Sequence, residues 1–112
     1  MGKIVKINIA SDFSKFPSGR NPEHGDFNGE VFREQFLVPN LQNREVTELH
    51  IDLDGILMRG SSFFEEAFGG LIRVNHLPLS LIKEKLKIEY NKRASFIKNI
   101  WEYIEKAEQQ RK

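Results

Sequence analysis

The sequence contains no cysteine, which excludes a disulfide framework and thiol chemistry. It has no apolar run near the roughly 20 residues that a membrane-spanning helix needs. The opening stretch, MGKIVKINIA, is interrupted by polar side chains too regularly for a signal peptide. Basic and acidic residues nearly cancel, giving a net charge of +1, so a strongly basic nucleic-acid-binding protein is not expected. These absences together favour a cytoplasmic protein.

The composition is that of one globular domain spanning residues 1–112, with 39% hydrophobic and 29% charged residues. The three histidines are scattered without the spacing of metal ligands. No serine–histidine–acid set or other nucleophile motif is present. We therefore expect no catalytic residue, no metal and no cofactor, and hence a protein that is not an enzyme.

Residues 46–73 form the most informative stretch, a strand, a loop and a helix. In the strand, Leu49, Ile51 and Leu53 alternate with polar residues, as in a sheet with one buried face. The helix is indicated by an apolar stripe at helical spacing. Its members are Phe64, Ala67, Phe68 and Leu71.

Both ends of this helix carry local signals. Ser62 and Glu65 have the spacing of a capping box, in which Ser62 caps the helix and Glu65 reaches back to a free backbone N–H. Gly69 and Gly70 near the other end cost about 1 kcal/mol each relative to alanine inside a helix. We therefore expect either the close approach of a neighbouring backbone, which we favour, or a ragged helix end.

The rest of the chain alternates strands and helices. Asn28 is expected to cap a helix that Pro39 ends or kinks. The pattern predicts an α/β fold in which a small mixed sheet carries its helices mainly on one face. The further elements are a first strand in residues 3–10, a loop in 12–27, a short helix in 79–85, a strand in 86–90 and a closing helix after residue 95.

Several motifs together resemble the STAS-like domain family of unknown function, which is distantly similar to the STAS anti-sigma factor antagonists of bacteria. The motifs are Gly19-Arg20, Asn28-Gly29-Glu30 with Phe32-Arg33, Asp52-Leu53-Asp54-Gly55, and Gly60-Ser61-Ser62-Phe63 running on to Leu71. The resemblance implies a small STAS-like fold and a regulatory role in protein interaction. It implies no particular biochemical activity.

The resemblance makes Ser61 a candidate phosphoacceptor, since STAS antagonists are phosphorylated on the first serine of the corresponding motif. A helix N-terminus tolerates the added dianion, whereas a docked partner would be repelled by it. Gly60 stands where that motif has an aspartate. The alternative is that Ser62 is simply the helix cap and Ser61 an exposed neighbour.

The same resemblance implies a protein partner, either a histidine-kinase-like ATPase or an anti-sigma-like protein. The apolar residues Ile56, Leu57 and Met58 in the loop form part of a docking surface or plug the core beneath the helix. The predicted docking residues are Met58, Arg59, Gly60, Ser61, Phe63 and Glu66.

Arg20, in a glycine-containing loop, is a candidate anion-binding residue, unless it pairs with Asp26, Asp52 or Asp54. Asp52 and Asp54 lack the further ligands of a calcium loop, and a turn-capping role is expected for them. Two other functions stay open. One is a small-anion or nucleotide-binding regulatory domain. The other is a toxin–antitoxin or nucleic-acid-associated component, suggested by the basic residues after position 82.

Overall fold

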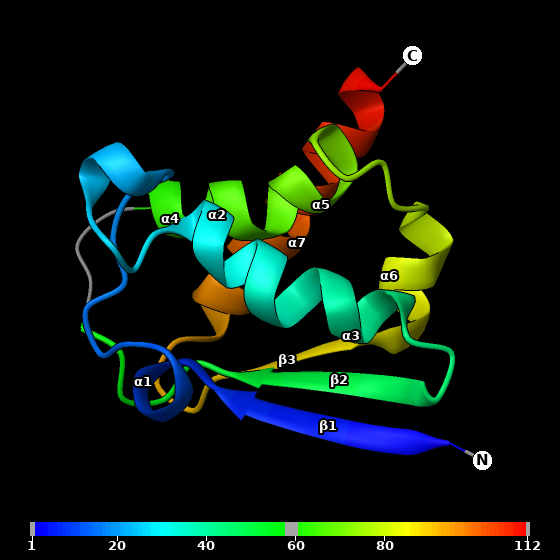
Figure 1. The fold of residues 1–112 in the computed structure, drawn as a ribbon, viewed down its shortest axis with the longest axis horizontal. Coiled ribbons are helices and arrows are strands. Elements are labelled where there is room, and N and C mark those ends of the chain that lie inside the picture. Colours follow the sequence, from blue (N-terminus) through cyan, green and yellow to red (C-terminus); the bar gives the residue numbers. More distant parts are fainter. Residues whose placement is uncertain (1, 58–60, 112) are drawn as a thin grey trace.

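A computed structural model describes residues 2–57 and 61–111. Its centre is a three-stranded sheet in the order β1 (Lys3–Asn8), β2 (Val46–Asp52), β3 (Leu86–Glu89). The helices lie above one face of this sheet (Figure 1). The predicted small α/β fold with helices on one face is confirmed. Both strand pairings in the described residues are parallel, so the sheet is not the mixed one that was expected.

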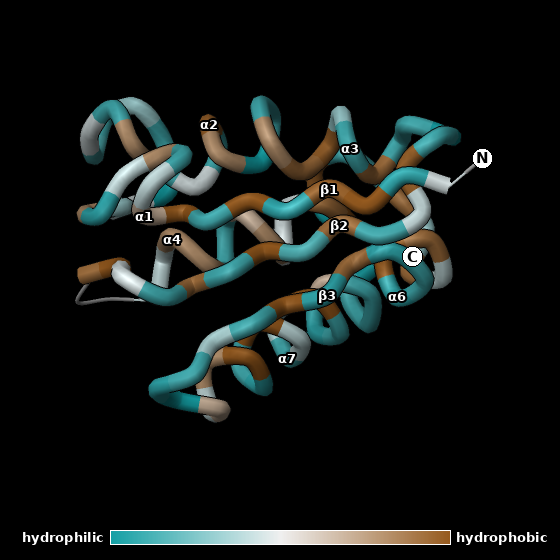
Figure 2. The backbone as a smooth tube through the Cα atoms, turned by 90° about the horizontal axis from the view of Figure 1, so that it is seen from below, coloured by the Kyte–Doolittle hydropathy of each residue, from teal (hydrophilic) through white to brown (hydrophobic). Residues whose placement is uncertain are grey.

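Alternation along the strands separates a buried face from an open face. In β2, Leu49 and Ile51 are fully buried beneath the helices. On the opposite face, Lys6 and Lys87 lie in register on either side of His50. Figure 2, seen from the open face, shows hydrophilic and hydrophobic residues alternating along the strands. Period-2 alternation is the mark of a sheet covered on one side, so the sequence pattern and the architecture agree.

The first long helical segment runs through α2 (Gly29–Phe32), a π-helical turn η2 (Arg33–Leu37) and α3 (Val38–Gln42). The Asn28 side chain accepts a hydrogen bond from the Val31 backbone N–H at 2.9 Å, which confirms the predicted cap. Of the two effects expected of Pro39, a helix end or a kink, the helix end is wrong. The preceding turn widens, with the Val38 N–H donating to the Arg33 carbonyl, and the helix continues through the proline.

The second segment runs through α4 (Ser62–Phe64), a π-helical turn η3 (Glu65–Gly69) and α5 (Gly70–Arg73). It packs against α2 at Gly29. A Cβ atom at Gly29 would lie 2.6 Å from the Phe63 carbonyl oxygen and 3.0 Å from the Ala67 backbone nitrogen. Only glycine therefore permits the two helices to come this close.

The remaining elements complete the layer. They are α1 (Ile9–Asp12), the 3₁₀ turn η1 (Pro22–His24), α6 (Leu79–Lys85) and α7 (Ala94–Gln110). The long α7 lies against η3 and α5 and buries Ile100 and Ile104. Among the described residues, no helix combines the length and the apolar character that crossing a membrane requires.

Candidate functional site

Ser61 lies at the surface immediately before α4. Its backbone is already near-helical (φ −99°, ψ −7°), and its carbonyl accepts a hydrogen bond from the Glu65 N–H at 3.0 Å. Ser61 therefore occupies the cap position, and Ser62 is the first helical residue. The Ser61 side chain makes no capping hydrogen bond. The capping box predicted from Ser62 and Glu65 is wrong, because Glu65 is held elsewhere.

Glu65 and Glu66 belong to a network with three arginines from three parts of the chain. We call Arg20, Arg33, Glu65, Glu66 and Arg73 the Arg–Glu network. Glu65 accepts hydrogen bonds from Arg20 and, at 2.8 Å, from Arg73 Nη1. Glu66 accepts from Arg33 Nη1 at 2.7 Å, and its Oε1 lies 3.4 Å from Arg73 Nη2. The network connects the 18–28 loop, η2, η3 and α5.

The network sets the ionisation of Glu65. Burial by itself would raise the pKa of the Glu65 carboxyl, but hydrogen bonds from Arg73 and Arg20, together with their charges, outweigh it and lower that pKa below its usual value. Hydrogen bonding to Glu65 in turn raises the pKa of Arg73. Arg20 pairs through Nη1 with Glu65, so its charge is already partly matched within the fold. None of the three aspartates named as possible partners holds it.

Sequence reasoning assigned no role to two network members, Arg73 and Arg33, of which Arg33 is the buried one. It is only 1% exposed, and its Nη1 also donates to the Glu66 carbonyl at 2.6 Å. The guanidinium lies against Gly70, where a Cβ atom would overlap Nη1. This confirms that the glycine pair marks a close approach, although a side chain, rather than a neighbouring backbone, occupies the space at Gly70. The signal in the sequence was an arginine directly after Phe32 together with a Gly-Gly step elsewhere in the chain.

The predicted docking residues separate into three groups. Ser61 is exposed, as a docking or modification site requires. Phe63 is only 1% exposed, and its ring packs near Phe13 and Phe32, so its assignment to a docking surface is wrong. Glu66 is mostly enclosed by the Arg–Glu network. The predictions for Met58, Arg59 and Gly60 fall outside the described residues.

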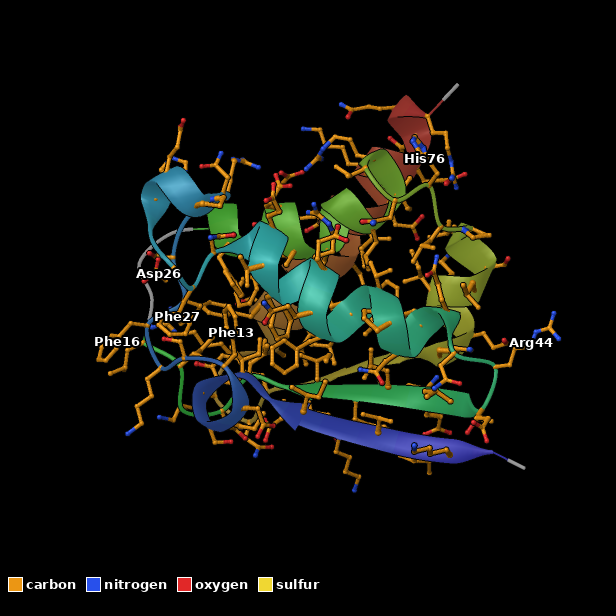
Figure 3. All side chains as sticks on the ribbon, viewed as in Figure 1. Phe13, Phe16, Asp26, Phe27, Arg44 and His76 are labelled. Carbon is orange, nitrogen blue, oxygen red and sulfur yellow. The ribbon has the colours of Figure 1, made fainter. Side chains whose placement is uncertain are left out.

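The loop's apolar residues divide between core and surface. Ile56 is buried, whereas Leu57 is 61% exposed. The Leu57 N–H donates to the Lys15 carbonyl at 2.6 Å, which ties this loop to the 13–18 segment. Phe16 and Phe27, 65% and 48% exposed, lie at the same end of the molecule (Figure 3). Apolar side chains are thus concentrated at the surface near the start of α4.

A cleft of about 640 Å³ opens beside these residues. Tyr90 and Phe96 pack with tilted rings whose centroids lie 5.3 Å apart, and the Arg93 guanidinium lies 5.9 Å from the Phe96 centroid. The cleft follows the carboxyl ends of β2 and β3, where ligands commonly bind on parallel sheets. We call it the aromatic cleft. Its lining consists of Phe16, Ile56, Leu57, Tyr90, Lys92, Arg93 and Phe96.

A family model described as a STAS-like domain of unknown function (DUF4325) matches residues 28–91, which is more than half of the chain. The chain belongs to this family. The matched segment of the STAS-like domain contains Ser61 and all of the Arg–Glu network except Arg20. Phe16 and residues 92–96 of the aromatic cleft lie outside it. No curated protein and no solved structure matched the chain.

The two aspartates of the STAS-like domain hold turns together. The Asp54 N–H donates to Asp52 Oδ1 at 3.0 Å, which confirms the expected turn role. Asp54 also accepts from the Asn91 side chain at 2.8 Å, and Asp52 from the Asn8 side chain at 3.1 Å. The described residues contain no cluster of three or more candidate metal ligands.

Proposed function

We propose that this STAS-like domain is a non-enzymatic regulatory module that docks a protein partner at the end bearing Ser61. One observation carries the proposal. Three of the five exposed large hydrophobic residues in the described chain, Phe16, Phe27 and Leu57, lie at that end. A contiguous apolar patch on a soluble domain marks an interaction site more often than scattered single side chains do.

Docking at this end is supported by burial energetics. Apolar surface removed from water contributes roughly 25 cal/mol per Å². The exposed rings of Phe16 and Phe27 therefore offer a partner a favourable contact that the fold itself leaves unused. Phe13 beneath them packs edge-on against Phe27 at 5.3 Å, which holds that ring in place for a partner.

Phosphorylation of Ser61 would regulate docking at this same end of the molecule. The hydroxyl is exposed and makes no capping hydrogen bond, so a kinase can reach it without opening the helix. A phosphate adds about −1.5 to −2 charges at neutral pH. The cost of desolvating that charge under a docked partner would weaken binding. Family resemblance supports a histidine-kinase-like ATPase or an anti-sigma-like protein as that partner.

The modification is tested by incubating the domain with a candidate kinase of that class and ATP. We expect phosphate on the wild type and on Ser62→Ala, which serves as the matched control, and none on Ser61→Ala. Mass spectrometry of the digested protein locates the phosphate. Phosphate on Ser61→Ala at the wild-type level would contradict the assignment of Ser61.

Docking is tested by affinity for the partner. We expect Ser61→Asp to bind about tenfold more weakly, which corresponds to 1.4 kcal/mol, and Ser61→Ala to bind like the wild type. Equal affinity of Ser61→Asp and the wild type for the partner would contradict regulation of docking by phosphorylation at Ser61. Wild-type affinity of Phe16→Ser for the partner would contradict the assignment of docking to this surface.

A further inference from the structure

We infer that the aromatic cleft receives an acidic segment of the partner that inserts one apolar side chain between Phe16 and Phe96. The inference rests on the proposed function, because it names the chemistry of the partner at the same end of the molecule. It places the principal electrostatic contacts at Lys92 and Arg93.

The floor of the cleft is apolar and fixed. Ile56 is buried, and Phe96 is held between Tyr90 and Phe64, with ring centroids 5.3 Å and 6.0 Å away. The cleft volume of about 640 Å³ is within the range of ligand-binding sites. A side chain of the size of leucine or phenylalanine can therefore be desolvated there without rearrangement of the core.

The rim of the cleft carries unmatched positive charge. Lys92 and Arg93 are exposed and form no ion pair with any described acidic residue. None of the described residues that line the cleft is acidic. The arginines of the Arg–Glu network, by contrast, are all paired with glutamates. Complementary charge across an interface directs the approach of the partner and selects against wrong ones, so this rim favours carboxylates.

The shape of the cleft favours a segment of a protein over a small molecule. Small-molecule sites typically enclose most of their ligand. Here the outer walls are the exposed side chains of Phe16 and Leu57, and the exposed Phe27 lies at the same end of the molecule (Figure 3). An extended surface of this kind fits a peptide chain that contacts several side chains in succession.

Selection from a displayed library of random peptides on the immobilised domain tests the inference. We expect the selected sequences to combine aspartate or glutamate with a neighbouring leucine or aromatic residue. The tightest of them is then synthesised, together with a version in which every acidic residue is replaced by its amide. Calorimetry should show about tenfold weaker binding of the amide version, a loss of roughly 1.4 kcal/mol.

Charge reversal in the protein provides the matched control. The double variant Lys92→Glu with Arg93→Glu should bind the acidic peptide at least about tenfold more weakly. Lys98→Glu with Lys106→Glu makes the same change of charge at exposed positions of α7 outside the cleft and should leave binding near the wild-type level. Circular dichroism verifies that both double variants are folded.

Three outcomes would overturn the inference. Either no peptide is selected, or the selected peptides lack acidic residues, or the cleft variant binds them as tightly as the wild type. A fourth outcome is thermal stabilisation by ATP or GTP that the cleft variant loses, with no peptide bound, which would assign the cleft to a nucleotide.

Failure of the proposed function looks different. If a partner loses affinity for Ser61→Asp but binds the Lys92 and Arg93 double variant normally, docking stands and the cleft assignment fails. If acidic peptides require Lys92, Arg93 and Phe16 but the partner binds Ser61→Asp and the Lys92 and Arg93 double variant like the wild type, the preference of the cleft for acidic peptides stands and docking of that partner at this end fails.

Discussion

The Arg–Glu network and the aromatic cleft use the same kinds of residue in opposite ways. In the network, Arg33 is buried and paired with Glu66, and neighbouring rings such as Phe32 and Phe63 are enclosed in the core. In the cleft, Arg93 has no acidic partner among the described residues and Phe16 is largely exposed. Satisfied charges and buried rings stabilise a fold, whereas unsatisfied ones are available to a partner. Substitutions in the network should therefore change stability, and substitutions in the cleft should change binding.

The largest effect within the Arg–Glu network is expected at the buried pair Arg33 and Glu66. Glu66→Leu leaves the Arg33 guanidinium without its main carboxylate and should lower the free energy of unfolding by about 3 kcal/mol. Combining it with Arg33→Met removes the stranded charge and should recover part of that loss. Urea unfolding of the two single variants and the double variant measures the coupling. Strict additivity of the two single losses would show that the pair is not coupled.

Gly29→Ala tests the close approach of the two helical segments. The added methyl group meets the Phe63 carbonyl and the Ala67 N–H, neither of which can move alone, so we expect a loss of about 1–3 kcal/mol. Alanine is otherwise the better helix former by up to about 1 kcal/mol. Whether Gly29→Ala lowers or raises the free energy of unfolding therefore shows whether the two helical segments pack this closely. A thermal melt that rises in the alanine variant would contradict this packing, with the exposed Glu30→Ala as control.

The ionisation of Glu65 should make stability depend on pH. Its pKa is lower in the folded state than the ordinary value of 4.5, so the unfolded state binds more protons between the two values. The stabilisation is complete above pH 4.5 and is lost as the pH falls through the folded-state pKa. Glu65→Gln should flatten this part of the profile. Urea unfolding of the wild type and Glu65→Gln between about pH 3 and 6 measures this pH dependence. Parallel profiles of the two proteins would show that Glu65 does not contribute to it.

The smallest effect on stability is expected in the cleft. Phe16→Ser removes a ring that the fold leaves exposed, so the free energy of unfolding should change by no more than about 0.5 kcal/mol. Phe63→Ser, which removes a buried ring, should cost about 3–5 kcal/mol. Equal losses in the two variants would show that Phe16 supports the core.

The sequence predicted those features that depend on neighbouring residues. The alternation in β2, the Asn28 cap and the glycine pair in the central helix all follow from local patterns, and all are present. The exposure of Ser61 follows from its position before an apolar helix. The family also followed from motifs, since the 28–91 match contains most of them.

The failures involve residues distant in sequence. The capping box at Ser62 and Glu65 is absent because Ser61 occupies the cap position, and the Glu65 carboxylate binds Arg73 and Arg20, the latter 45 residues away. Phe63 was assigned to the docking surface through the resemblance, although its place beside the apolar stripe of the helix was a local signal of burial. The aromatic cleft draws on three separate segments around residues 16, 57 and 93, so no local pattern could indicate it.

The most direct measurement is the affinity of Phe16→Ser for the tightest peptide selected on the wild type, made on protein whose unfolding curve matches that of the wild type. If the cleft is the docking surface, binding weakens about tenfold or more while the fold is unchanged. Wild-type affinity in this variant would contradict the assignment of binding to the exposed end of the domain.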